Sequence, residues 1–225
     1  MLNNNKKSVI SNYNQLLESV KEACVKYDRD ISSINIVAVS KQQSIDKINA
    51  LKSLGHISFG ENRLDEASLK WNTVENSKLH FIGALQSKKI KDIVKIFDVI
   101  ETLDTETAAK KISLLKKNND KYPKLFVQIN IGNEQQKRGV APSDFSDFLN
   151  MCKKKYLLNI TGAMCMPPLK EDPDPYFEKM LSICTKENIK TISMGMSNDF
   201  EKAIKYGATN IRVGSLIFGA REGTK

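Results

Sequence analysis

The chain has 225 residues, with 35 lysines and arginines against 26 aspartates and glutamates and a formal net charge of +9. This length allows one domain to bury its own core, and the 40% hydrophobic content is typical of globular proteins. No apolar run approaches the roughly 18 residues of a membrane span, and the start, MLNNNKKSVI, lacks the apolar core of a signal peptide. We therefore expect one domain over residues 1–225, in the cytoplasm, with no membrane contact.

Metal and nucleic-acid sites are not indicated. The four cysteines are scattered, form no CxxC pair and are accompanied by only two histidines, which argues against zinc or disulfides and fits a reducing compartment. The positive charge is carried mostly by lysines on the polar faces of predicted helices, as at Lys110 and Lys111. Nucleic-acid binders favour clustered arginines. We therefore predict neither a metal site nor binding to nucleic acid.

The predicted elements alternate between strands and helices along the whole chain. A helix from about Val9 to Lys26 comes first, and the apolar run Ile34–Ser40 then predicts a strand buried on both faces. The other expected strands are His56–Phe59, Leu79–Gly83, Phe97–Thr102, Leu125–Asn130, Ile160–Met164, Thr191–Met194 and Thr209–Val213. Helix-period segments separate them, and this alternation is typical of parallel α/β folds.

Capping residues and prolines mark the expected boundaries. Ser44 and Asp104 are expected N-caps, Gly55 and Gly207 expected helix ends, and Pro167–Pro175 an expected loop. Eight strands alternating with helices at this length favour a single (β/α)₈ barrel with an additional N-terminal helix. A doubly wound open sheet is the alternative, although no G-x-G-x-x-G follows the first strand.

Lys41 directly follows the first predicted strand, at its carboxyl end. Side chains alternate along a strand, so Lys41 shares a face with Val37 and Val39. In a barrel the carboxyl ends of the strands hold the active groups. An amine held there out of water has a lowered pKa and is a nucleophile toward aldehydes, whereas a solvated strand-end lysine would do nothing. Both interpretations stay open from this run alone.

Two segments after the seventh and eighth predicted strands, Ser193–Asp199 and Arg212–Ser215, are candidates for an anion site. Barrel phosphate sites often use the loops at these positions. Ser197 is expected to cap the next helix, and Gly214 allows close backbone approach beside the hydroxyl of Ser215. Such turns also occur in other α/β folds, so an ordinary turn remains the alternative.

An amine, an anion site and an arginine together match one ligand well. Pyridoxal 5′-phosphate presents an aldehyde for Lys41 and a phosphate for the two loops. Arg212, placed opposite the pyridine nitrogen, would disfavour protonation there and weaken the ring as an electron sink. The residues thus predict a pyridoxal phosphate site in which carbanion chemistry is blunted.

The chain also resembles the pyridoxal phosphate homeostasis proteins, whose fold is similar to the N-terminal barrel of bacterial alanine racemases. The resemblance covers Ile34 to Glu222. The matching motifs are Val37–Lys41, Phe59–Asn62, His80–Gln86, Gln128–Asn130, Glu134 and Lys137 before Gly139, Gly162–Pro168, Ser193–Ser197, Ile211–Ser215 and Phe218–Arg221. So many motifs in the same order identify the chain as a member of this family.

The resemblance implies a role for each candidate residue. It implies that Lys41 forms a Schiff base with pyridoxal phosphate, that Arg212 lies near the pyridine nitrogen and that Asn62 lies close to the cofactor. The phosphate-binding residues that the resemblance implies are Ser197, Gly214 and Ser215. Ser215 stands where the family usually has threonine, which keeps the hydroxyl. Lys88 replaces a usual asparagine, which puts the local role of its loop in doubt.

The implied function is a pyridoxal phosphate-binding protein without turnover, which contributes to vitamin B6 homeostasis and supplies apoenzymes. A racemase-like enzyme is the alternative. It would need an acid or base on each face of the ring, and the sequence offers Lys41 for one face only. The second, β-rich domain of the racemases is not expected here, because the resemblance runs to Glu222 of the 225 residues. We expect no catalytic residues and a monomer.

Overall fold

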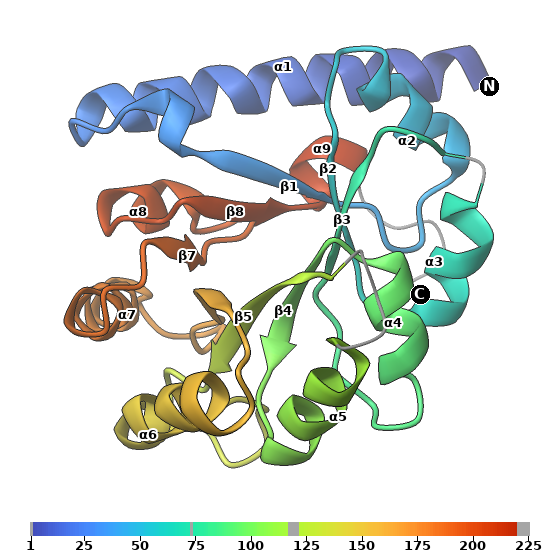
Figure 1. Ribbon diagram of the computed structural model, residues 1–225. Helices are drawn as coiled ribbons and strands as arrows, with labels where there is room; N and C mark the ends of the chain where they lie inside the picture. Colours follow the sequence, from blue (N-terminus) through green and yellow to red (C-terminus); the bar gives the residue numbers. More distant parts are fainter. Residues whose placement is uncertain (1, 73, 117–121, 220–225) are drawn as a thin grey trace.

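Eight parallel strands close into a barrel in the computed structural model, which describes residues 2–72, 74–116 and 122–219. The strands pair in chain order and the last pairs back with the first (Figure 1). They are β1 Asn35–Val39, β2 Ser58–Glu61, β3 Lys78–Phe81, β4 Val99–Leu103, β5 Lys124–Ile129, β6 Ile160–Cys165, β7 Thr191–Ser193 and β8 Asn210–Val213. The predicted barrel is confirmed, and the open sheet is wrong.

Helices surround the barrel. They are α1 Leu2–Lys26, α2 Ile45–Lys52, α3 Leu64–Trp71, α4 Ile90–Ile96, α5 Glu106–Lys116, α6 Phe145–Asn150, α7 Asp174–Lys186, α8 Phe200–Lys205 and α9 Ser215–Phe218. Short helical turns lie at Ile31–Ser33, Pro142–Asp144 and Met151–Lys155. Among the described helices, none is both long enough and apolar enough to cross a membrane.

The additional helix α1 fills a place in the outer layer. The helix after β8, α9, has only four residues and cannot cover its side of the barrel. α1 packs against α2, α8 and α9 instead, with Val9, Leu16 and Val20 buried along one face (Figure 1). Because α1 supplies the missing helical cover between α8 and α2, β1 and β8 are shielded from water there.

Several expected boundaries are displaced, and α1 begins at Leu2 rather than near Val9. Two of the displacements have a clear physical reason. β2 begins at Ser58 rather than at His56, whose ring instead hydrogen-bonds to the Tyr13 hydroxyl and the Ser58 carbonyl oxygen. The segment Pro167–Pro175 is a loop only as far as Pro173, since α7 starts at Asp174. A proline in the first turn of a helix loses no helical hydrogen bond, so Pro175 does not exclude the helix.

Helix caps were predicted with mixed success. Gly55 and Gly207 follow α2 and α8 with φ of +81° and +86°, as expected for helix ends. Ser44 occupies the N-cap position of α2, but its side chain makes no capping bond. Asp104 is not the cap of α5. The Thr105 hydroxyl accepts the N–H of Ala108 at 3.3 Å.

The barrel interior combines an apolar lining with a polar layer. A Cβ built on Gly60 would lie 3.1 Å from Val37 Cγ1 and 3.6 Å from Val39 Cγ2, so both valines lie on the inner face of the barrel together with Gly60. Below them the hydrogen-bonded side chains of Ser58, His80, Glu101, Ser193 and Arg212 fill the interior. Of the motif residues at the chain end, Ala220, Arg221 and Glu222 lie outside the described residues.

Candidate functional site

A cavity of about 890 Å³ opens at the carboxyl ends of the strands. The six residues that the sequence selected all line it: Lys41, Asn62, Ser197, Arg212, Gly214 and Ser215. They come from three neighbouring strand ends, β8, β1 and β2, and from the loop after β7. Closure of the barrel therefore brings together residues far apart in sequence, because β8 pairs with β1.

Lys41 lies in the turn directly after β1, half-buried on the cavity wall beside Val39. The turn is closed by the N–H of Gln43, which donates to the Ser40 carbonyl at 3.1 Å. Ser40 is fixed from behind: its hydroxyl donates to Glu61 Oε1 at 2.7 Å, and Lys70 Nζ donates to its carbonyl oxygen at 2.8 Å. These bonds hold the backbone on which Lys41 is mounted.

Glu61, which anchors this turn, is itself fully buried at the end of β2. Its Oε1 atom also accepts from Lys70 Nζ at 2.9 Å and from Trp71 Nε1 at 3.2 Å. Burial raises the pKa of Glu61, although the charge and hydrogen bond of Lys70 act in the opposite direction. Trp71 packs on Phe59 at a ring distance of 4.9 Å, so this end of α3 is fastened to the barrel wall.

Ser197 reaches the cavity on a tight loop between β7 and α8. Gly195 has φ of +89°, and a Cβ there would lie 2.5 Å from the Ala203 side chain, so the turn requires glycine. The Gly195 carbonyl accepts the Arg212 N–H at 2.9 Å. The prediction that Ser197 caps α8 is wrong. The residue before α8 is Asp199, whose Oδ1 closes the loop onto the Met196 N–H at 2.6 Å.

Gly214 and Ser215 form the start of α9, against the end of β1. A Cβ on Gly214 would lie 3.3 Å from the Val39 carbonyl oxygen, so the glycine lets this loop approach β1 closely. The Gly214 carbonyl accepts from Ile217 at 3.0 Å and from Phe218 at 2.9 Å, which fixes the turn. Ser215 thus lines the same cavity as Lys41, from the end of the neighbouring strand.

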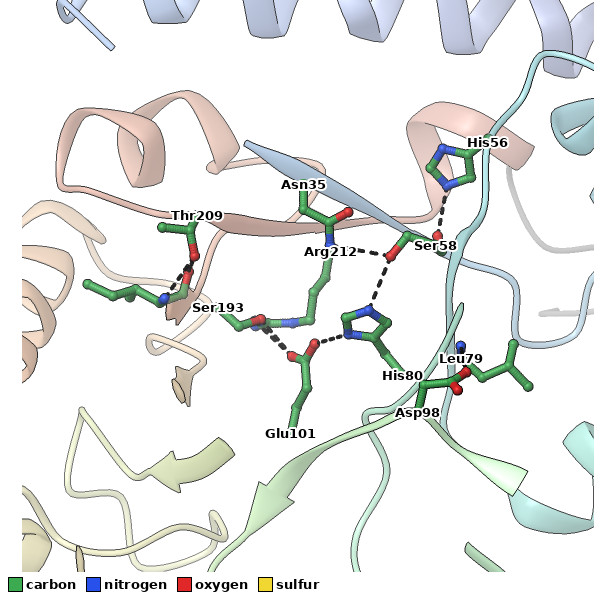
Figure 2. A network of polar contacts seen from close by, with 11 residues as sticks. Asn35, His56, Ser58, Leu79, His80, Asp98, Glu101, Ser193, Thr209 and Arg212 are labelled. Atoms are coloured by element: carbon green, nitrogen blue, oxygen red, sulfur yellow. Dashed lines mark hydrogen bonds and ion pairs between the residues drawn. The ribbon is translucent and has the colours of Figure 1, made fainter. Parts of the chain in front are cut away.

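Arg212 is buried in β8 with 4% of its surface exposed and still lines the cavity. Its Nη1 donates to Ser193 Oγ at 2.7 Å and its Nη2 to the Cys165 carbonyl oxygen at 2.8 Å. Ser193 in turn donates to Glu101 Oε2 at 2.6 Å, and His80 Nδ1 lies 2.6 Å from Glu101 Oε1 (Figure 2). The buried arginine is thereby joined to a buried carboxylate.

Sequence reasoning missed Glu101, and it named Ser193 and His80 only within candidate segments or matching motifs, without a role of their own. A signal was present, because Glu101 is the one charged residue within the apolar strand β4 and a charge there needs a partner. Burial by itself raises the pKa of Glu101, but hydrogen bonds from His80 and Ser193 and the charge of Arg212 outweigh it and hold the pKa below its usual value. Glu101 is therefore a carboxylate at neutral pH.

The sulfur-containing residues near the site have different positions. Met164, Met166 and Met196 line the cavity, whereas Met194 is fully buried away from it. Cys165 is also fully buried, and burial raises the pKa of its thiol to about 12, which fits a packed rather than a reactive side chain. All four cysteines are free thiols. Within the described ranges, no cluster of histidine, cysteine and carboxylate side chains could hold a metal ion.

The outer rim of the cavity is formed by the loop between β6 and α7. Its lining residues are Pro167, Pro168, Leu169, Glu171 and Pro173. Lys202 of α8 also lines the cavity and pairs with Asp172 at 2.6 Å and Asp174 at 3.2 Å, which ties this loop to α8. The wall therefore offers two lysine amines, a guanidinium and two serine hydroxyls, a set suited to a small anionic aldehyde.

Comparisons with known proteins agree with this geometry. Residues 17–222 match the family model described as "Alanine racemase, N-terminal domain". The pyridoxal phosphate homeostasis protein of Haemophilus influenzae is 31% identical over 224 residues, covering 93% of this chain and 94% of that protein. The human protein of the same name is 33% identical over 233 residues, with 92% and 85% covered. The chain belongs to the pyridoxal phosphate homeostasis protein family.

A solved member of similar fold contains the cofactor. PipY of Synechococcus elongatus, whose structure has pyridoxal phosphate bound, superposes with a TM-score of 0.77 at 27% sequence identity. The match covers 89% of this chain and 100% of that one. The family resemblance drawn from the motifs is therefore confirmed, as is its relation to the alanine racemase barrel.

Proposed function

We propose that this protein binds pyridoxal 5′-phosphate in the cavity without turning over a substrate, and thereby contributes to vitamin B6 homeostasis. One observation carries the proposal: the Lys41 amine, the Arg212 guanidinium and the Ser197 and Ser215 hydroxyls line the same cavity. These are the groups that an aldehyde, a pyridine ring and a phosphate require. The names of the relatives and the cofactor bound in PipY support the same ligand.

Each lining residue has a proposed task. When bound, the cofactor supplies an aldehyde, which condenses with a primary amine to form a carbon–nitrogen double bond and release one water. Lys41 provides that amine from a turn that is held in place by the hydrogen bond from the Ser40 hydroxyl to Glu61. Ser197, Gly214 and Ser215 would hold the phosphate, and Asn62, which follows β2, would lie close to the cofactor. Arg212 donates toward the pyridine nitrogen.

The lining argues against turnover as a racemase. Racemisation needs a second acid or base on the face of the ring opposite Lys41. Among the described lining residues there is no tyrosine or histidine, and the titratable side chains besides Lys41 and Arg212 are Glu171, Asp199 and Lys202. Asp199 is held by the Met196 N–H, and Lys202 is paired with Asp172. We infer that the protein holds the cofactor rather than catalysing a reaction with it.

The decisive test is the visible spectrum of the purified protein with added pyridoxal phosphate. We expect an absorption band in the visible region that is absent from the protein alone, because the cofactor becomes bound to an amine. Borohydride reduction should fix the cofactor to Lys41, as mapped by mass spectrometry, and Lys41→Ala should abolish both band and adduct. The matched control is Lys202→Ala, which removes the other lysine that lines the cavity and should keep both.

The alternative racemase function is tested separately. Purified protein with alanine in deuterium oxide should show no multiple-turnover exchange at the α-carbon, and sustained exchange would overturn the inference of a protein without turnover. A protein that stays colourless with excess cofactor would refute binding itself. These two failures are distinguishable, because the first requires a bound cofactor and the second excludes it.

The same proposal includes a cellular role. As a single barrel domain that acts as a monomer in the cytoplasm, the protein would buffer the reactive aldehyde and pass it to apoenzymes that depend on pyridoxal phosphate. Transfer to an apoenzyme can be followed by the return of that enzyme's activity in the presence of a scavenger for free aldehyde. Size-exclusion chromatography with light scattering tests the expected monomer.

A further inference from the structure

The side-chain hydrogen bonds inside the barrel lead to one carboxylate, that of Glu101. The guanidinium of Arg212 can only donate, so Ser193 Oγ accepts from it and gives its own proton to Glu101 Oε2. On the other side, His80 Nδ1 donates to Glu101 Oε1 at 2.6 Å. Figure 2 shows both paths converging on the Glu101 carboxylate from opposite sides. Glu101 is therefore the common acceptor of the layer.

The other ring nitrogen of His80 is hydrogen-bonded to Ser58. Asn35 Nδ2 donates to Ser58 Oγ at 3.3 Å, which leaves the Ser58 hydroxyl proton for His80 Nε2 at 3.1 Å. The proton on Nδ1 then points at Glu101. This arrangement fixes the tautomer of the ring and the orientation of the carboxylate together (Figure 2).

Arg212 and Glu101 form a buried pair of opposite charges inside the barrel. Arg212 and Glu101 lie 4.0 Å apart with 4% and 0% of their side chains exposed. A buried guanidinium without a counter-charge would be strongly unfavourable. Glu101 is therefore the fully buried counter-charge of Arg212, in addition to Asp199, whose charge interacts with Arg212 from the cavity side.

The protein uses only part of the hydrogen-bonding capacity of Arg212. A guanidinium has about five N–H groups. Within the described residues, two of them have acceptors, Ser193 Oγ and the Cys165 carbonyl oxygen. The side chain also lines the cavity. The two bonds thus fix the plane of the guanidinium while N–H groups remain for a ligand.

We propose that Glu101, acting through Ser193, is a positioning residue that aims Arg212 at the ring nitrogen of the bound cofactor and keeps that nitrogen an unprotonated hydrogen-bond acceptor. The proposal rests on the proposed function, since it concerns the same cavity. In this proposal Glu101, Ser193 and His80 orient Arg212 through hydrogen bonds and do not themselves contact the cofactor. An unprotonated ring is a poor electron sink, which agrees with binding without turnover.

The test uses full-length protein with pyridoxal phosphate labelled with nitrogen-15 in the ring. The nitrogen-15 chemical shift separates a protonated, a hydrogen-bonded and a free pyridine nitrogen. We expect the shift of a hydrogen-bonded, unprotonated nitrogen in the wild type and that of a nitrogen without its donor in Arg212→Ala. Glu101→Gln and Ser193→Ala should move the signal at least half of the way toward Arg212→Ala and weaken binding on the order of tenfold.

The matched control is His56→Gln, a buried polar substitution next to the same layer. His56 bonds to Tyr13 Oη and the Ser58 carbonyl oxygen and has no bond to Glu101. It should keep the wild-type nitrogen shift, whereas a shift equal to that of Glu101→Gln would mean that general loosening of the barrel explains the effect. Unchanged shifts in Glu101→Gln and Ser193→Ala would overturn the proposal.

Misfolding of a variant and failure of the wild type to bind the cofactor can each be told apart from failure of the proposal. If Glu101→Gln does not fold, Ser193→Ala decides the question, because it removes one hydroxyl and leaves the Glu101–His80 bond in place. Its unchanged nitrogen shift would then refute the proposal. A wild-type protein that gives no bound signal would instead refute the proposed function.

Discussion

Gly83 and Asn62 approach each other so closely that a Cβ on Gly83 would lie 2.1 Å from the Asn62 carbonyl oxygen. Both residues line the cavity, Asn62 just after β2 and Gly83 just after β3. The Gly83 carbonyl oxygen also accepts the Thr102 hydroxyl at 2.6 Å, which holds Gly83 against β4. The position of Asn62 on the cavity wall therefore depends on the absence of a side chain at residue 83.

Gly83→Ala should displace Asn62 and weaken cofactor binding. The new methyl group meets backbone rather than a flexible side chain, so we expect a loss of about 1–3 kcal/mol in the free energy of unfolding as well. Urea denaturation measures the stability, and titration with pyridoxal phosphate measures the affinity. Wild-type values for both would contradict the steric argument.

Gly55→Ala is the control for this substitution. A Cβ at Gly55 meets nothing within 4 Å, but its φ of +81° disfavours alanine. We expect a stability loss of about 1 kcal/mol from the backbone conformation and unchanged cofactor affinity.

The serine at position 215 should distinguish phosphate binding from an ordinary turn. If its hydroxyl binds the phosphate, Ser215→Ala should weaken binding of pyridoxal phosphate roughly tenfold or more, because hydrogen bonds to charged groups contribute about 1.5–3 kcal/mol. Ser215→Thr keeps the hydroxyl and should bind like the wild type. Binding of pyridoxal, which lacks the phosphate, should be nearly the same in all three proteins. An equal loss for both ligands in Ser215→Ala would point to a turn role.

Histidine 56 should make stability depend on pH. Burial lowers its pKa below the ordinary 6.5, although its bond to the Ser58 carbonyl acts in the opposite direction. As the pH falls below 6.5, the unfolded chain therefore takes up the proton more readily than the folded protein, and the free energy of unfolding decreases. His56→Gln should show a smaller decrease between about pH 7 and 5.5, measured by urea denaturation at each pH. An identical pH dependence in both proteins would refute this assignment.

The barrel and the lining of its cavity could be predicted because both depend on patterns that are local in the sequence. Each strand is a short apolar run between helix-period segments, and Lys41, Ser197 and Arg212 lie at or just after strand ends, where barrels place their sites. Glu101 was missed because its importance arises only when β4 and β8 face each other across the interior. Its sequence neighbours show that it needs a partner but do not show that the partner is Arg212.

The wrong helix caps have a similar cause. Ser197 and Asp199 are both acceptable caps by residue type, and Asp199 takes the position because its carboxylate closes the loop onto Met196. Asp104 is likewise a good cap by type. It is instead held by Arg138, a residue 34 positions later in the sequence. Competition between a local cap and a distant partner cannot be resolved from the local pattern.

Asp104 and Arg138 should prove coupled, whereas Thr105 should carry the cap of α5. Arg138 Nε and Nη2 donate to the two carboxylate oxygens of Asp104 at 2.7 and 2.9 Å, and Asp104 is only 3% exposed. Because Arg138 is 46% exposed, we expect a modest coupling of about 0.5–1 kcal/mol in a double-mutant cycle of Asp104→Asn and Arg138→Gln. Thr105→Ala should lose about 1 kcal/mol, additively with Arg138→Gln. Coupling between Thr105 and Arg138, with none between Asp104 and Arg138, would reverse the assignment of cap and ion pair.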